Sequence, residues 1–257
     1  MIPKKIHYCW LGGSPLPKSA VKCINSWKKY CPDYEIIEWN ETNLDFENVP
    51  DFVKQAYEAK AWGFVPDYFR LWIIYNYGGI YLDTDVQVIR SFDPLLGNSA
   101  FAGFEIENSV ALGLGFGAEK GNQMIKEHLE LYNSISFKNE DGSVNKLPSP
   151  VITTEWLVSR GLVLGRNKIE NVNGMKIYPK EYFAPKSFDT GIVKITKNTF
   201  SIHQYDASWF TEEEKLQHKK ALRNYRIQKI TKFPNRVLMK ILGEEGYYKL
   251  KKSIKGK

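Results

Sequence analysis

The chain has 257 residues, of which 43% are hydrophobic and 25% are charged, proportions typical of a globular protein. This length fits one large domain, or a domain with a small appendage, and no apolar stretch approaches the roughly 18 residues of a membrane-spanning helix. The first residues show no signal-peptide pattern, so we expect a cytoplasmic protein. Three cysteines without metal-site spacing predict reduced, buried thiols.

The net charge of +7 is concentrated towards the C-terminus. Residues 211–257 contain 14 Lys or Arg against 5 Glu, a net charge of +9, which leaves residues 1–210 at −2. Apolar residues such as Phe233, Leu238 and Ile241 recur there at helical spacing among the cations. Such a segment either lies on an anionic membrane surface or packs on the body as a helical appendage. We predict a catalytic domain over residues 1–210 and a basic, amphipathic helical tail over residues 211–257.

The residues before position 90 predict alternating strands and helices. The expected strands are Lys5–Trp10, Tyr34–Trp39, Ile80–Leu82 and Val86–Ile89, and the expected helices are Pro17–Tyr30, Pro50–Lys60 and Pro66–Tyr77. Their order indicates an α/β sheet, in which ligands gather at the carboxyl ends of strands. Trp10 and Asp83 both fall at such ends, so we expect them to share one cleft.

The pattern beyond position 90 is less regular. The expected strands are Ser99–Phe104, Val110–Ala118 and Phe200–His203, the expected helices are Asn122–Tyr132 and Val151–Ser159, and Asn139–Pro150 is an expected loop. The expected strand Val110–Ala118 contains Gly113, Gly115 and Gly117, so we expect backbone or ligand to approach closely there.

The segment Gly78–Val86, GGIYLDTDV, is the most informative part of the sequence. Asp83 and Asp85 follow a short apolar run that opens at a glycine pair. In an extended chain, residues i and i+2 point the same way, so the two carboxylates are expected to face one point. They would repel each other unless a cation lies between them. A hard divalent ion such as Mg2+ or Mn2+ suits these ligands and would in turn hold a diphosphate.

Other residues have chemistry suited to such a ligand. Asp67 and Arg70 lie on one face of a predicted helix and could bind sugar hydroxyls or phosphate, unless they form an ordinary ion pair on a solvated face. Trp10 offers a flat ring for stacking a base, or it is a core tryptophan. His203 is a candidate ligand for a Mn2+-type ion, with a purely structural histidine as the alternative.

Three motifs in this order resemble glycosyltransferase family thirty-two, the sugar transferases with a DXD motif. They are IPKKIHYCWLGG at Ile2–Gly13, PDYFR at Pro66–Arg70 and GGIYLDTD at Gly78–Asp85. That family includes α-1,4-galactosyltransferases, α-1,6-mannosyltransferases and bacterial capsular-polysaccharide enzymes. The motifs are also similar, more distantly, to the glucosyltransferase domains of large clostridial toxins. The resemblance is specific over Ile2–Ile89 and looser at His203–Trp209.

The resemblance implies a GT-A type, Rossmann-like catalytic domain that binds a nucleotide-sugar donor, commonly a UDP-sugar, through Mn2+ or Mg2+. Carried onto this chain, Trp10 would stack on the base, and Asp67 and Arg70 would hold the donor sugar. One departure from the family pattern is Pro66, which stands where many members have a serine before the aspartate.

The resemblance also implies roles at the diphosphate. Asp85 would be the direct metal ligand, and Asp83 would contact ribose and sugar hydroxyls and reach the metal through water. His203 falls at the position of a late metal or diphosphate contact, and Ser208 and Trp209 would contact the leaving diphosphate. The catalytic set is then Asp83, Asp85 and Arg70.

The expected activity is that of a retaining hexosyltransferase with a glycan or lipid-linked acceptor, working in bacterial surface polysaccharide synthesis. Retention through a covalent intermediate needs a carboxylate nucleophile. Glu105, Glu107 and Glu155 are possible, but we prefer a front-face mechanism in which the leaving diphosphate deprotonates the acceptor. The enzyme is expected to be peripheral on the inner face of the plasma membrane, with residues 211–257 on the anionic surface and no nucleic acid partner.

Two alternatives come from other classes. A haloacid dehalogenase-type, Mg2+-dependent phosphohydrolase has an Asp-x-Asp-x-Thr/Val motif, but Gln87 here follows the pattern at the position of the hydroxyl or valine. A non-catalytic basic module that binds membrane or nucleic acid would explain the tail but not the paired carboxylates.

Overall fold

The computed structural model describes residues 1–145, 147–206, 213–214, 216–225, 227, 243 and 245–246. The chain divides into two compact units. The first unit comprises Met1–Lys186 and Val193–Trp209, and the second comprises Ser187–Ile192 and Phe210–Lys257. All the strands and helices named below lie in the first unit.

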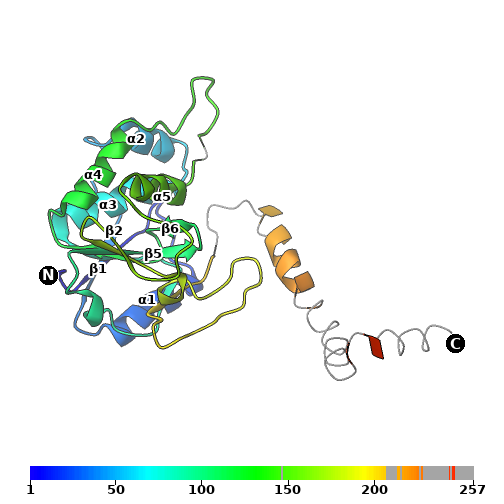
Figure 1. The fold of residues 1–257 in the computed structure, drawn as a ribbon. Coiled ribbons are helices and arrows are strands. Elements are labelled where there is room, and N and C mark those ends of the chain that lie inside the picture. The colour runs from blue at the N-terminus through cyan, green and yellow to red at the C-terminus, as the bar shows by residue number, and fades with distance from the viewer. Residues whose placement is uncertain are drawn as a thin grey trace. The chain divides into compact units, whose positions relative to one another are not determined.

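A mixed sheet forms the centre of the first unit (Figure 1). Its order is β2 (Glu35–Trp39), β1 (Lys5–Cys9), β3 (Gly79–Tyr81), β7 (Phe116–Ala118), β5 (Ala100–Ile106), β9 (Met175–Tyr178) and β8 (Glu170–Val172), and β6 (Ser109–Ala111) also pairs with β5. Strands β2, β1, β3, β5 and β9 run in one direction, whereas β7 and β8 are antiparallel to their neighbours. The sheet is therefore mostly parallel.

Helices and a small second sheet cover the two faces of this sheet. Hydrophobic side chains of α2 (Asp51–Glu58), α3 (Val65–Tyr77), α4 (Gln123–Glu130) and α5 (Ser149–Ser159) share one core cluster. On the other face, side chains of α1 (Lys18–Tyr30) pack with those of β4 (Val86–Val88), and β4 pairs antiparallel with β10 (Ser201–His203). The result is a layered α/β architecture.

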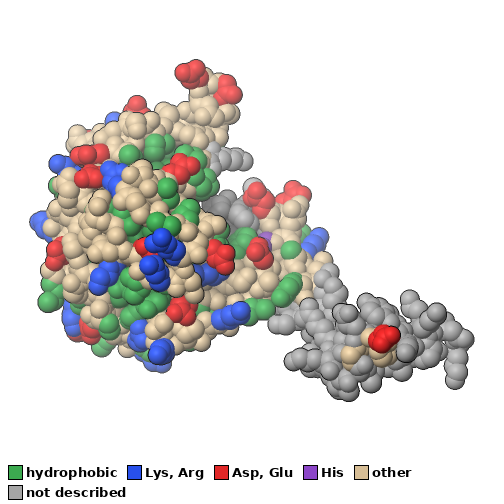
Figure 2. All heavy atoms as spheres, viewed as in Figure 1, with side chains coloured by type: hydrophobic (Ala, Val, Ile, Leu, Met, Phe, Trp, Pro, Cys, Tyr) green, Lys and Arg blue, Asp and Glu red, His purple; other side chains and the backbone are tan. Residues whose placement is uncertain are grey.

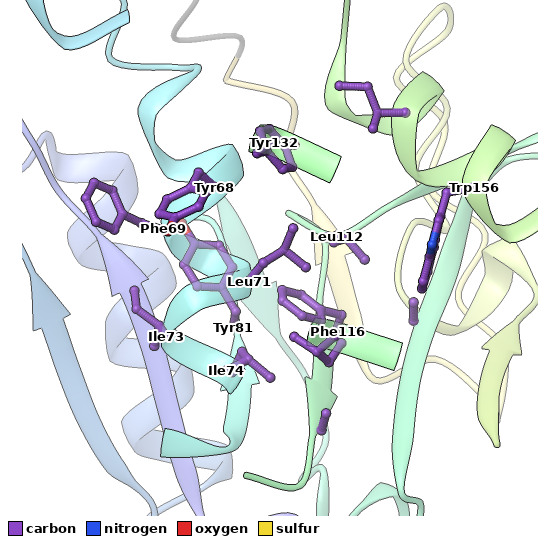
Figure 3. Close-up of a cluster of buried hydrophobic side chains, with 14 of the residues drawn as sticks. Tyr68, Phe69, Leu71, Ile73, Ile74, Tyr81, Leu112, Phe116, Tyr132 and Trp156 are labelled. Atoms are coloured by element: carbon purple, nitrogen blue, oxygen red, sulfur yellow. The ribbon is translucent and has the colours of Figure 1, made fainter. Parts of the chain in front are cut away.

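Helix α3 is the most deeply buried of these helices, because its sequence is apolar on nearly every side. Figure 3 shows Tyr68, Phe69 and Leu71 of this helix gathered with Phe116 and Tyr132. Each fully buried aromatic or aliphatic side chain contributes roughly 1.5–3 kcal/mol of hydrophobic free energy. A charged residue on such a helix is therefore held in a fixed and largely dry environment.

The predicted elements before position 90 are confirmed, with ends that differ by one or two residues. The predicted strand Val110–Ala118 is interrupted: β6 and β7 both pair with β5, but Ala111 lies opposite Gly103 and Gly117 lies opposite Phe101. The residues between them leave the ladder in a turn. The hairpin of β8 and β9 was not predicted, although Asn173-Gly174 is a strong hairpin signal, with φ values of 48° and 91°.

The described part of the second unit contains helical residues at 213–214 and 216–225. Within this unit, the ring of Phe188 stacks on His218 with 4.3 Å between the centroids. Most of the predicted amphipathic tail, including Phe233 and Ile241, lies outside the described residues.

The surface of the first unit is of mixed charge, as its near-neutral sequence predicts. Figure 2 shows basic and acidic side chains interspersed on the visible face, with hydrophobic side chains between them. In the part of the chain that the structure describes, no helix is long and apolar enough to cross a membrane.

Candidate active site

The candidate site begins where two neighbouring parallel strands end. In β1 and β3, Ile6 lies opposite Ile80, and the amide of Leu82 donates to the carbonyl of His7 over 3.0 Å. Trp10 and Asp83 therefore leave the sheet at the same edge, as the sequence predicted. Trp10 is half-buried. Its indole N–H donates to a backbone carbonyl of the following loop, and its stacking on a base stays a prediction.

Arg70 joins the two aspartates expected to bind the donor. Its Nη2 lies 3.1 Å from Asp67 Oδ1 and 3.3 Å from Asp83 Oδ1. The side chains of Arg70 and Asp67 are only 7% and 8% exposed, so this is a buried pair and not the solvated surface pair of the alternative interpretation. The guanidinium also lies over the ring of Tyr81, 5.3 Å from its centroid.

Burial and the neighbouring charges have opposite effects on the pKa values of Asp67 and Arg70. Burial raises the pKa of Asp67 to about 6, although Arg70 and a 2.8 Å hydrogen bond from Ser149 Oγ favour the ionised form. Burial opposes the charge on Arg70, but Asp83 and Asp67 outweigh it and raise its pKa above the ordinary value. The cluster is therefore a carboxylate pair with a permanent cation between its members.

Gly113 makes room for Asp83. The amide of Asp83 donates to the Gly113 carbonyl over 2.8 Å, and a β-carbon at Gly113 would lie 1.9 Å from Asp83 Oδ2. The turn between β6 and β7 positions this glycine next to the carboxylate. The expectation of a close approach along this glycine-rich segment is confirmed, and the approaching group is a side chain of the DXD motif.

The expectation that Asp83 and Asp85 lie in one extended segment is wrong. Strand β3 ends at Tyr81, Thr84 and Asp85 form a turn, and the Val86 amide donates back to the Asp83 carbonyl over 3.1 Å. This turn directs the two carboxylates to different protein partners. Asp83 faces Arg70 and Gly113, whereas Asp85 faces β10.

Asp85 lies against the end of β10. Its Oδ1 is 3.2 Å from His203 Nε2, and its Oδ2 accepts the Asp206 amide over 3.0 Å. The pairing of β4 with β10, in which Val86 lies opposite His203, brings these residues together across more than 100 positions. Burial opposes the charge on Asp85, but the contact with His203 outweighs it and lowers the pKa.

His203 lies between two carboxylates. Its second nitrogen, Nδ1, is 3.3 Å from Glu105 Oε1, and its side chain is 6% exposed. Burial opposes the charged imidazolium, yet Asp85 and Glu105 together raise the pKa of His203 to about 10. Glu107 and Glu155, the other carboxylates considered as nucleophiles, are both exposed to solvent, in the turn after β5 and on α5 respectively.

The arrangement of Asp85 and His203 fits a small divalent ion with few protein ligands. Asp85 Oδ1 and His203 Nε2, a carboxylate oxygen and an imidazole nitrogen of the kinds that Mn2+ accepts, lie 3.2 Å apart and would hold it. Among the described residues, no group of three or more His, Cys, Asp or Glu side chains could hold a metal. Such an ion would need further oxygens from a bound diphosphate, and its binding would displace the Nε2 proton.

Three residues make contacts at this site that the sequence did not assign to them. Ser149 at the start of α5 supports Asp67, Gly113 accommodates Asp83, and Glu105 faces His203. Only the glycine-rich stretch gave a sequence signal, because the other two contacts are long-range. Ser208 and Trp209 lie outside the described residues.

Residues 17–102 match the family described as "Glycosyltransferase sugar-binding region containing DXD motif". This region includes Asp67 and Arg70 on α3 and the turn with Asp83 and Asp85. It therefore corresponds to the DXD-containing sugar-binding region of glycosyltransferases, and it favours this class over a phosphohydrolase or a non-catalytic module.

Two curated relatives from Schizosaccharomyces pombe carry more specific names. Inositol phosphoceramide mannosyltransferase 3 is 37% identical over 99 residues, which are 37% of this chain and 27% of that protein. Inositol phosphoceramide mannosyltransferase 1 is 30% identical over 110 residues, 39% of this chain and 33% of that protein. The chain thus spans about a third or less of the length of these relatives.

A solved structure described as the PaToxG glycosyltransferase has a similar fold. Its TM-score is 0.50 at 22% sequence identity, and the similarity covers 62% of this chain and 69% of that one. This likeness concerns the fold alone. It agrees with the layered α/β fold and its mostly parallel sheet.

Proposed function

We propose that this chain is a metal-dependent, retaining glycosyltransferase with a GT-A type catalytic domain, related to family thirty-two, that transfers a hexose from a nucleotide sugar. The observation that carries the proposal is the buried Arg70, which bridges Asp67 on α3 and Asp83 of the DXD motif. A buried ion pair is costly unless its geometry is good and its remaining atoms are satisfied. Two carboxylates held this rigidly are well suited to accept hydrogen bonds from sugar hydroxyls.

The donor would bind along the carboxyl ends of β1 and β3. Trp10 would stack on the base, Asp67 would bind the sugar, and Asp83 would accept hydrogen bonds from ribose and sugar hydroxyls. Arg70 holds these two carboxylates in place, and because its charge is already shared between them, we assign it orientation in preference to direct neutralisation of the diphosphate. Positioning of this kind can account for a large part of a transfer reaction's rate enhancement.

Cleavage of the sugar C1–O bond leaves negative charge on the departing diphosphate. Asp85 and His203 would hold Mn2+ or Mg2+, which as a Lewis acid stabilises this charge by several kcal/mol. Glu105 faces the imidazole of His203 and is not free to act as a nucleophile there. This supports the front-face route to retention, in which the diphosphate oxygen takes the acceptor proton.

The donor and acceptor are proposed by class. Because two relatives are named mannosyltransferases, we include GDP-mannose with the UDP-sugars among the candidate donors. Their names also include a lipid acceptor, inositol phosphoceramide, which agrees with a lipid-linked glycan acceptor here. A role in bacterial surface polysaccharide synthesis rests on the motif resemblance.

A panel of UDP- and GDP-sugars, assayed for hydrolysis and thermal shift with and without Mn2+, tests the proposal. We expect one donor to be hydrolysed only with the metal, and Asp85→Asn to lose this activity. Asp141→Asn, in an exposed loop, is the matched control and should keep it. Hydrolysis of generic phosphate esters with no response to any nucleotide sugar would refute the proposal.

We further propose that residues 211–257 bind the anionic inner surface of the plasma membrane, with the protein otherwise cytoplasmic and without a nucleic acid partner. Each cation near such a surface contributes about 1 kcal/mol. Deletion of residues 233–257 should weaken binding to liposomes that contain phosphatidylglycerol, while binding to neutral liposomes stays low for both forms. Unchanged binding to the anionic liposomes would contradict this part of the proposal.

A further inference from the structure

Glu105 combines two features that the proposed donor chemistry does not use. It is the extra residue of a β-bulge, because Phe104 lies opposite Val110 whereas Ile106 lies opposite Ser109. Bulges in antiparallel pairs re-aim a side chain and occur often beside active sites. Here the bulged residue is a carboxylate near the end of its strand.

The second feature is the atom that Glu105 faces. His203 Nδ1 is fully buried and makes no hydrogen bond of regular geometry within the described residues, yet Glu105 Oε1 lies 3.3 Å away. The carboxylate of Glu105 is 21% exposed, so it is freer to rotate than the imidazole, and a small rotation would complete a bond from Nδ1–H. A buried polar atom without a hydrogen-bond partner destabilises the fold, which favours this rotation.

The two nitrogens of His203 therefore have separate partners. Nδ1 faces Glu105 from β5, and Nε2 faces Asp85 Oδ1 at 3.2 Å. A histidine that ligates a metal through one nitrogen commonly donates the other N–H to a carboxylate, which fixes the ring orientation and the tautomer. The tilted ring of Tyr205, 4.2 Å away between centroids, packs beside the imidazole and limits its movement.

We propose that Glu105 is a positioning residue, which accepts a hydrogen bond from His203 Nδ1 and so presents Nε2, beside Asp85, to a divalent cation. The inference rests on the proposed metal-dependent function. It assigns to Glu105 no contact with the donor or the cation, in keeping with the finding that no three such side chains among the described residues surround one metal position.

Mn2+ affinity in the presence of UDP or GDP tests this inference without turnover. The change from Glu105 to Ala should weaken Mn2+ binding by about 10- to 100-fold, and Glu105→Gln, which keeps an acceptor oxygen and the side-chain volume, should weaken it less. Glu107→Gln, two positions away in the exposed turn, is the matched control and should bind as the wild type does. Equal affinities in all four proteins would overturn the inference.

A spectroscopic signature separates positioning from a general structural role. A slowly exchanging imidazole proton on His203 Nδ1 should be present in the wild type and in Glu107→Gln, and lost in Glu105→Ala. Persistence of this proton in Glu105→Ala would overturn the inference while leaving the proposed function intact. A wild type that binds no Mn2+ with either nucleotide would overturn the metal dependence and this inference together.

Discussion

Arg70 Nη2 and Asp83 Oδ1 lie 3.3 Å apart, which connects helix α3 to the segment that leaves β3. The connection depends on the glycine pair between them. Gly78 ends α3 with φ 65°, its amide donates to the Ile74 carbonyl over 2.9 Å, and a β-carbon there would lie 2.8 Å from the Lys120 amide nitrogen. Only glycine lets the chain reverse so tightly. The sequence GG before the DXD motif therefore sets the distance between the two parts of the site.

Replacing Arg70 by Lys should disable both donor carboxylates. The lysine keeps a cation but cannot reproduce the planar fork that contacts Asp67 and Asp83, and a buried carboxylate left without its hydrogen-bond donor costs about 1–3 kcal/mol. Urea unfolding should show a loss of this order together with loss of donor hydrolysis. Arg166→Lys, at a surface pair with Glu170 whose arginine is 48% exposed, should change neither property, and equal behaviour of the two variants would contradict the prediction.

Replacing Gly113 by Ala should displace Asp83. The added methyl would lie 1.9 Å from Asp83 Oδ2, so the turn or the carboxylate must move. Overpacking costs about 1–3 kcal/mol, and a displacement near 1 Å can lower the rate about 100-fold. Gly97→Ala, where nothing lies within 4 Å of the new methyl, is the control. A fully active Gly113→Ala enzyme would show that the position of Asp83 is not critical.

Replacing Ser149 by Ala should change the pH dependence of donor use. Burial already raises the pKa of Asp67 to about 6, and the hydrogen bond from Ser149 opposes that shift. Loss of the bond raises this pKa further. As the pH is lowered, Asp67 in the variant therefore becomes protonated, and stops accepting hydrogen bonds from sugar hydroxyls, at a higher pH than in the wild type. We expect kcat/KM at pH 6 to fall about tenfold, with a smaller change at pH 8. The profile of Ser159→Ala, on the same helix, should match the wild type.

His7 should make folding sensitive to mild acid. It is fully buried between the Gly78 carbonyl and the Trp39 indole N–H, and burial lowers its pKa from 6.5 to about 4. Because the folded pKa is the lower one, its contribution is complete above pH 6.5 and is lost as the pH falls towards 4. Unfolding free energy should drop by about 2 kcal/mol from this group between pH 7.5 and 5. His7→Gln should reduce this drop in unfolding free energy between pH 7.5 and 5. An unchanged drop would show that other groups cause it.

The local elements were predictable because their signals are local. Alternation marks β1 and β2, Pro66 marks the first turn of α3, and the spacing of Asp67 and Arg70 places them on one helical face. The register of β10 against β4 has no such signal, so only the family resemblance, and no local pattern, associated His203 with Asp85. The same holds for Ser149, which meets Asp67 across 82 positions.

The sequence by itself determined the chemistry available at this site, two carboxylates after a glycine pair and a charged pair on an apolar helix, together with the concentration of positive charge in residues 211–257. Only the tertiary structure decided how these groups are used. The turn at Thr84 and Asp85 separates the carboxylates of the DXD motif, so that Asp83 joins Arg70 and Asp85 joins His203. Side-chain direction follows from local backbone geometry, but the partner that a side chain meets depends on strand pairing between distant segments, which no local pattern encodes.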